Sequence, residues 1–410
     1  MTADMSTFLR SLSWSLFGTA ISAFLFFIIN ILAGRLLGPT EYGKYNLVAT
    51  ISGVLAVFIT LGFDTTVIKF VSSTKKEEDK NFFLSNALII ISISSIVILL
   101  LVVTLSRFLA IKLNTDKLLV IIGALYAIIF TFKTFFDSII RALHKFKIQA
   151  FVKSIEALVA TISFFVLIIV LEHKSYVFYV CAVFIAAIVL LLIYFYQIKA
   201  RFRRWSGKHF QSAKPYAMTV LATSLATIVT VTIDRFAINI ALGPKVLGIY
   251  SAYLISTTII ASQISAAITN VFFPTISKSP DKIGLMRKVD NLLIWIGFPF
   301  LIIMSLLSIA IIFLFGVNYH LNLIYVFLSS SVAFLQLAAV FYVTIAMTSE
   351  KLFVLYTKFA YLKLIIILVV YSALFVLKLI SISSVLEVLA IASIYDIFVT
   401  RYIIENKSGD

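Results

Sequence analysis

Apolar runs long enough to cross a lipid bilayer recur along the whole length of this 410-residue chain. Crossing the hydrocarbon core takes about 20 apolar residues, and we identify twelve such runs. They begin near Phe8, Tyr45, Phe82, Leu118, Gln149, Tyr176, Pro215, Leu247, Asn291, Leu321, Leu352 and Ile382. Composition agrees, because only 13% of the residues are charged, against about a quarter in soluble domains. The chain is therefore predicted to be an all-α polytopic membrane protein.

A short phrase occurs twice at matching points of this pattern. LGPTEYGKY begins at Leu37 and LGPKVLGIY begins at Leu242, 205 positions later, and each joins one apolar run to the next. Glycine permits the turn out of a helix and proline cannot continue it, so each phrase by itself indicates a tight hairpin. Its duplication predicts two pseudo-symmetric six-helix bundles, 1–198 and 215–410, as in transporters whose halves rock about a central site. A basic linker, 199–214, joins them, and Pro215 is expected to start the next helix.

Lysine and arginine are unevenly distributed between the two sets of loops. With both termini on one side, most of the 34 cations fall on that side, which the positive-inside rule identifies as cytoplasmic. The net charge of +16 lies in short juxtamembrane loops, so topology and anionic membrane lipid explain it, and no nucleic-acid partner is expected. No loop is long enough for a catalytic domain, which argues against an enzyme. The single cysteine, Cys181, excludes an intramolecular disulfide.

Two sequence patterns that could indicate a cofactor lack residues that cofactor binding requires. The segment from Gly38 to Lys44 is one residue short of a phosphate-binding loop, because Tyr45 stands where serine or threonine must hold the metal. A bound nucleotide is therefore not expected. The four histidines lie in different loops without ligand spacing, so neither a metal nor another cofactor is predicted.

Ionisable residues within the apolar runs are the candidate functional residues, since a charge near the bilayer centre costs about 2.5–3.5 kcal/mol on insertion scales. Lys133, Asp137 and Arg141 are spaced i, i+4, i+8 on one helix face. This ladder is either a self-neutralised stripe or a functional one. Asp234 and Arg235 are adjacent and must point in different directions, so at least one should reach another helix or a cavity. Both interpretations of that pair, function and structural cross-linking, remain open.

Other ionisable residues lie closer to the ends of the runs. Arg35 is near the outer end of the first run, where its side chain can reach water. Asp64, Glu156 and Asp396 are placed near cytoplasmic ends, where hydration is easy.

Three passages resemble a known family. They are AGRLLGPTEYGKY with the following LGFDTTVIKFVS, SIIRALHKFK at the end of the fourth run, and IDRFAINIALGPKVLGIYSAY in the seventh. They resemble the polysaccharide (oligosaccharidyl-lipid) flippases of the multidrug, oligosaccharidyl-lipid and polysaccharide exporter superfamily. The similarity covers essentially the whole chain, although the C-terminal third matches by hydropathy more than by motif.

The resemblance implies a flippase that moves a polyprenyl-diphosphate-linked oligosaccharide from the cytoplasmic to the outer leaflet by alternating access. Such a protein would serve surface polysaccharide biosynthesis, for example of O-antigen or capsule, in the bacterial plasma membrane, with both termini cytoplasmic. It implies a monomer that can associate with polysaccharide assembly proteins. The diphosphate requires cations, and Lys133, Arg235 and Arg35 are the candidates. Asp137, Asp234 and Asp64 are candidates for ion coupling.

Two alternative functions are kept. A drug or cation antiporter of the same fold is one, and the acids beside Lys133 and Arg235 are compatible with it. A membrane glycosyl polymerase is the other, but it would need a sizeable outer loop with catalytic residues, which this sequence lacks. The sugar, the glycan product and the coupling ion are left open by the sequence.

Overall fold

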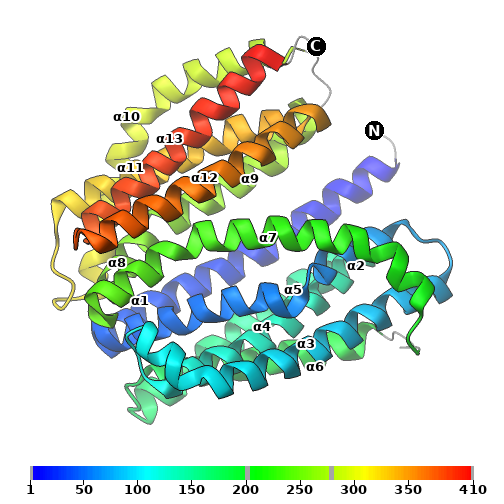
Figure 1. Ribbon diagram of the computed structural model, residues 1–410, viewed down its shortest axis with the longest axis horizontal. Helices are drawn as coiled ribbons and strands as arrows, with labels where there is room; N and C mark the ends of the chain where they lie inside the picture. Colours follow the sequence, from blue (N-terminus) through cyan, green and yellow to red (C-terminus); the bar gives the residue numbers. More distant parts are fainter. Residues whose placement is uncertain (1–2, 199–203, 277–280, 408–410) are drawn as a thin grey trace. The chain divides into compact units, whose positions relative to one another are not determined.

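The computed structural model describes residues 3–198, 204–276 and 281–407, and within them all regular secondary structure is helical (Figure 1). Contacts divide the chain into two compact units, Met1–Phe236 (unit 1) and Ala237–Asp410 (unit 2). We describe each unit by itself.

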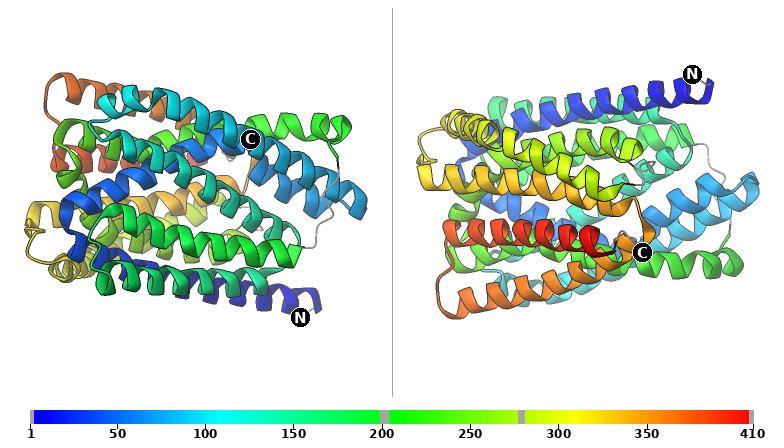
Figure 2. Two further views of the ribbon diagram at one scale, coloured as in Figure 1. Left: turned by 90° about the horizontal axis from the view of Figure 1, so that it is seen from below. Right: turned by 90° about the horizontal axis from the view of Figure 1, so that it is seen from above.

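Unit 1 contains six helices and most of a seventh. They are α1 (Ala3–Thr60), α2 (Phe63–Ser73), α3 (Glu77–Lys112), α4 (Lys117–Ala142), α5 (Phe146–Phe164) with the π-helical η1 (Phe165–Val170), α6 (Tyr176–Ile198) and α7 (Gly207–Leu242). Figure 2 shows α3 to α6 running side by side, and α1 packs along both α4 and α5. One close crossing is at Gly18, where a Cβ would collide with Ala150 of α5. Small residues permit such approaches between membrane helices.

Unit 2 holds the end of α7 and the remaining helices. They are α8 (Pro244–Leu254), the π-helical η2 (Ile255–Ile259), α9 (Ile260–Ile276), α10 (Lys282–Phe315), α11 (Leu323–Met347), α12 (Glu350–Val376) and α13 (Ile382–Lys407). The helix α11 is central, because it packs against α9, α10 and α13.

The duplicated phrase forms the same turn twice. Gly38 interrupts α1 with φ 77° and ψ 170°, and Gly243 separates α7 from α8 with φ 83° and ψ 174°. This region of backbone space is essentially restricted to glycine. Pro39 and Pro244 then open the next helix, where the missing N–H leaves no hydrogen bond unmade. The prediction that each copy of the phrase forms a turn between two helices is confirmed.

The predicted number of spans agrees with the helices. Among the described residues, 11 helices are long and apolar enough to cross a membrane. The first of them, Ala20–Thr60, contains the break at Gly38 and so comprises parts of two expected spans. The chain is an all-α, multi-pass membrane protein.

The start of α7 differs from expectation. The helix begins at Gly207 and contains Pro215, so the prediction that Pro215 starts it is wrong. Residues 199–203 of the expected linker lie outside the described residues. The contact boundary after Phe236 falls inside α7; the division at 1–198, 199–214 and 215–410, which rests on the sequence repeat, stays a prediction.

The first turns of α7 are held firmly on α2 and α3. The Asn86 amide donates to the Ser206 carbonyl (2.8 Å) and accepts from the Ser206 N–H (3.0 Å). His209 lies 3.1 Å from Asp79. Further along α7, the carbonyl of Ala217 would collide with any Cβ at position 62, which glycine occupies.

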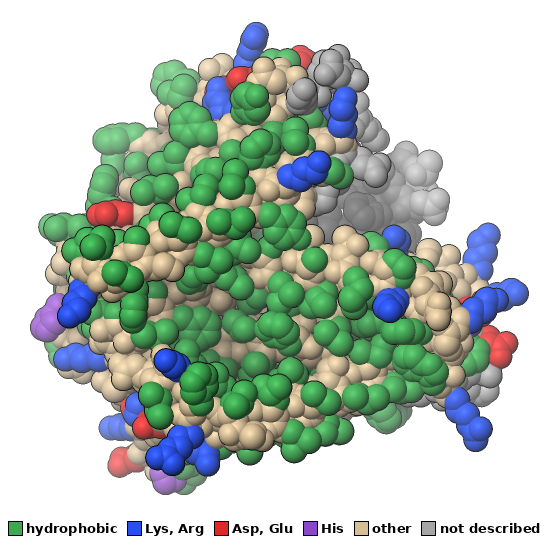
Figure 3. Space-filling model, in the orientation of Figure 1, with side chains coloured by type: hydrophobic (Ala, Val, Ile, Leu, Met, Phe, Trp, Pro, Cys, Tyr) green, Lys and Arg blue, Asp and Glu red, His purple; other side chains and the backbone are tan. Residues whose placement is uncertain are grey.

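Apolar side chains cover much of the surface of both units. On the face drawn in Figure 3, hydrophobic groups spread over the helices, and many charged side chains lie toward its edges. Trp295 and Val376 are among the exposed apolar residues. Such a surface suits contact with lipid chains.

Candidate functional site

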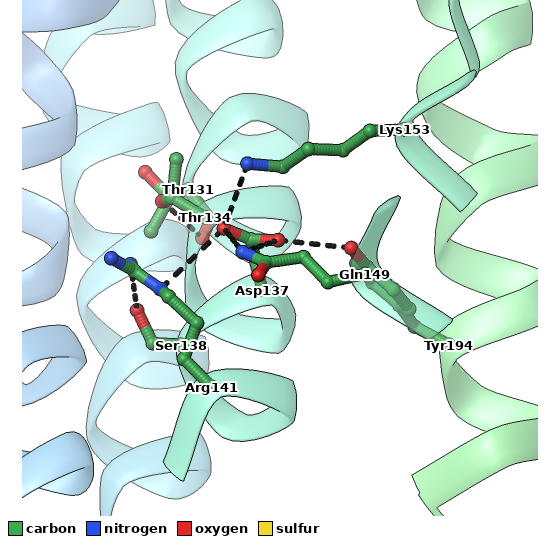
Figure 4. A network of polar contacts seen from close by, with 8 residues as sticks. All are labelled: Thr131, Thr134, Asp137, Ser138, Arg141, Gln149, Lys153 and Tyr194. Carbon is green, nitrogen blue, oxygen red and sulfur yellow. Dashed lines mark hydrogen bonds and ion pairs between the residues drawn. The ribbon is translucent and has the colours of Figure 1, made fainter. Parts of the chain in front are cut away.

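A half-buried carboxylate, that of Asp137, organises a polar cluster inside unit 1. Both oxygens of Asp137, on α4, accept from the Gln149 amide of α5 at 3.0 Å, and one accepts from the Tyr194 hydroxyl of α6 at 2.9 Å. Two cations also approach it: Arg141 Nε at 3.6 Å and Lys153 Nζ at 3.4 Å. All four side chains converge on Asp137 in Figure 4. The predicted contact between Asp137 and Arg141, one turn apart, is present.

Lys133 has a different partner from the one expected. It forms an ion pair with Glu156 of α5, not with Asp137. The sequence interpretation placed Glu156 at a hydrated cytoplasmic end, and this is wrong: its side chain is 2% exposed, near the middle of the span Phe146–Val170. One signal could have found it. Gln149, Lys153 and Glu156 follow i, i+4, i+7 spacing, which puts them on one helix face.

We call these seven residues the unit 1 cluster: Lys133, Asp137, Arg141, Gln149, Lys153, Glu156 and Tyr194.

The acids and the cations of the unit 1 cluster differ in exposure. Glu156 and Asp137 are 2% and 14% exposed, whereas Lys133, Lys153 and Arg141 are 24%, 29% and 45% exposed. The carboxylates are therefore less exposed than the cations that pair with them. This arrangement holds cations in place and presents positive charge outward.

Asp64 belongs to the surroundings of this cluster. It lies half-buried on α2 and interacts electrostatically with Arg141. Arg35, by contrast, is exposed on α1 shortly before the Gly38 turn. No described contact brings Arg35 to the unit 1 cluster, and the expectation that its side chain reaches water stays a prediction.

Asp234 and Arg235 occupy different environments on α7. The Asp234 side chain is buried, and Arg235 is half-buried. Arg235 interacts electrostatically with Tyr42. The Tyr42 hydroxyl also donates to the Asn30 amide oxygen at 3.3 Å. Asn30 is 205 positions before Arg235, so the two repeat-related residues interact with the same tyrosine.

Unit 2 contains two polar clusters that the sequence analysis missed. Lys363 of α12 pairs with Asp396 of α13 at 2.7 Å. Both residues lie near the middle of their helices, so the expectation that Asp396 is at a cytoplasmic end is wrong. In the second cluster, Asp290 of α10 accepts from Tyr342 of α11 and from Arg401 of α13, each at 2.6 Å. The described residues contain no group of three or more metal-ligating side chains.

Solved structures of known transporters share the fold of this chain. A lipid II flippase, MurJ, in an inward closed conformation has a TM-score of 0.65 and 16% identity, and the match covers 96% of this chain and 87% of that one. An inward-facing multidrug resistance MATE family transporter of the MOP superfamily has a TM-score of 0.63 and 13% identity, covering 96% and 99%. A MOP superfamily transporter from Pyrococcus furiosus has a TM-score of 0.55 and 13% identity, covering 97% and 95%. At these identities the likeness shows the fold, which is that of MOP superfamily transporters.

The family follows from the sequence. A family model described as polysaccharide biosynthesis protein matches residues 8–280, more than half of the chain, and the chain belongs to this family. No curated protein matches the sequence. The resemblance noted from the three sequence passages is thus confirmed.

Proposed function

We propose that the protein is a flippase that moves a polyprenyl-diphosphate-linked oligosaccharide across the bacterial plasma membrane by alternating access, with both termini cytoplasmic. The observation that carries the proposal is the exposure pattern of the unit 1 cluster. Cations that pair with less exposed carboxylates suit a diphosphate anion, which binds lysine and arginine through charge-assisted hydrogen bonds. Membership in a polysaccharide biosynthesis family supports this substrate class.

Lys133 is the first cation expected to contact the diphosphate, and Arg141 and Lys153 extend the site. Arg235 is a further candidate on α7, next to Tyr42. Arg35 is a weaker candidate, because it lies apart from the unit 1 cluster. Asp64, Asp137 and Asp234 remain candidates for coupling to an ion. The carboxylate hydrogen bonds of Asp137 give it at least a structural role.

The test is transbilayer movement in vesicles. Purified protein is reconstituted with a fluorescent polyprenyl-diphosphate sugar, and a reagent that quenches only outer-leaflet probe follows its movement. Lys133→Ala and Arg235→Ala should lose most of the activity at equal reconstitution, and Lys133→Arg should keep part of it because charge survives. Lys174→Ala, an exposed cation in the loop before α6, is the matched control and should move the probe normally.

A purely structural role for Lys133 predicts a different result in the same vesicle assay. Its partner is Glu156, so the variant Lys133→Ala with Glu156→Gln removes both charges and leaves no unpaired buried charge. If this double variant restores movement of the probe, Lys133 serves only to neutralise Glu156. Full activity in both single alanine variants would also remove the proposed site.

A drug or cation antiporter is the second candidate, favoured by the likeness to the MATE transporter. It predicts that expression confers resistance to cationic dyes, with no movement of the diphosphate probe. Dye resistance without probe movement would replace the first proposal.

A further inference from the structure

Glu156 stands out as the most enclosed charged group of the unit 1 cluster. It lies ten residues after the start of α5, which at 1.5 Å per residue is about 15 Å from that end and therefore near the centre of a core about 30 Å thick. Its side chain is 2% exposed, so water does not stabilise its charge. The stabilising counter-charge is the ammonium group of Lys133.

The other ionisable groups around Glu156 come from three helices. Tyr126 on α4 and Tyr194 on α6 interact with it electrostatically. Lys153 lies one turn earlier on α5 and is engaged with Asp137. Lys133 is accordingly the cation that directly neutralises Glu156.

The proposed diphosphate substrate would compete with Glu156 for the ammonium group of Lys133. Its ammonium group lies about 6.0 Å from the centre of the Phe26 ring of α1, and its side chain is 24% exposed, so a ligand can reach it. A diphosphate that binds there brings negative charge close to Glu156 and draws the ammonium toward itself. A buried carboxylate that loses its partner costs several kcal/mol. Such a group is neutralised by taking up a proton instead.

We propose that Glu156 is a proton-binding site whose occupancy is linked to diphosphate binding at Lys133. In the unliganded protein Lys133 neutralises Glu156; when the diphosphate engages Lys133, Glu156 takes up one proton from solvent. Release of the diphosphate frees Lys133 to return, and the proton leaves. The inference rests on the proposed function and adds a coupling ion and its residue.

Thermodynamic linkage between proton binding and diphosphate binding sets the expected pH dependence of the affinity. If binding takes up one proton, diphosphate affinity falls as pH rises, by up to about tenfold per pH unit. The effect is reciprocal, because a bound diphosphate favours protonation to the same extent.

The experiment measures proton uptake directly. Purified full-length protein in lipid nanodiscs is titrated with geranylgeranyl diphosphate at pH 8, by calorimetry in two buffers of different ionisation enthalpy. The wild-type protein should take up about one proton per bound probe. Glu156→Gln should bind the probe with that uptake lost, and its affinity should vary less with pH. Asp396→Asn removes another ion-paired intramembrane carboxylate, in unit 2, and should keep the uptake.

Each result decides one of the two proposals. If the wild-type protein binds the probe without proton uptake, or if Glu156→Gln takes up as much as wild type, the inference is wrong and the flippase proposal stands. If the wild-type protein does not bind the probe, the flippase proposal itself fails. Should Glu156→Gln not fold, the neutral pair Lys133→Gln with Glu156→Gln replaces it. That variant should bind more weakly and without the wild-type uptake, and retained uptake would overturn the inference.

Discussion

Replacement of Asp137 by alanine should destabilise unit 1 substantially, and the structure indicates why. The change removes the acceptor for the Tyr194 hydroxyl and for the Gln149 amide. Each buried donor left without a partner costs about 1–3 kcal/mol. The lost pairs with Lys153 and Arg141 add little, since both cations are partly hydrated. We therefore expect a loss of about 2–6 kcal/mol in the free energy of unfolding, mostly from the two hydrogen-bond donors.

The assay is denaturant unfolding in detergent micelles, followed by tryptophan fluorescence. Tyr194→Phe should cost only about 1 kcal/mol, because it removes one hydrogen bond. Asp137→Asn should fall between Tyr194→Phe and Asp137→Ala, since a carbonyl acceptor remains. Glu387→Ala, an exposed acid on α13, is the control and should leave stability unchanged. A cost below about 1 kcal/mol for Asp137→Ala would refute this reasoning.

Three further changes have defined outcomes. Gly38→Ala and Gly243→Ala should each lose about 1–3 kcal/mol of stability, because both glycines have the same disallowed backbone angles; thermal unfolding in detergent checks this, and no loss at either would contradict it. Asn86→Ala should release the start of α7 and speed protease cleavage within 199–214; an unchanged rate would argue against the docking. Lys363→Ala should reduce stability by about 3–5 kcal/mol, because Asp396 keeps its hydrogen bond with Tyr356 but loses its counter-charge; adding Asp396→Ala should recover most of it, and a double variant no more stable than the single one would contradict the pairing.

The helices and their turns could be predicted from the sequence, because apolar length and the Gly-Pro phrase depend on local chemistry. The spacing of Asp137 and Arg141 predicted their contact for the same reason. The pairing of Lys133 with Glu156 depends instead on how α4 packs against α5, and local spacing favoured Asp137.

The second source of error was the distance of charged residues from the ends of their helices. The hydropathy pattern predicts a fifth run from near Gln149, but α5 begins at Phe146 and its span continues through η1 to Val170. Glu156 therefore lies deeper than its sequence position indicated. Asp396 shows a similar error, because it lies in the interior of α13 and not at a cytoplasmic end.

The division of α7 between the units bears on how the protein is made. Ala213 and Ala217 of α7 are part of the buried core that joins α2 to α6 in unit 1. When the first six spans have left the ribosome, the core residues of α2 and α3 that α7 covers are still exposed to lipid or to chaperones. Insertion of α7 buries them, so maturation of the N-terminal bundle must wait for the first helix of the second sequence repeat. A messenger truncated before codon 207 would therefore yield a bundle whose core is incompletely covered, which is a substrate for membrane quality control.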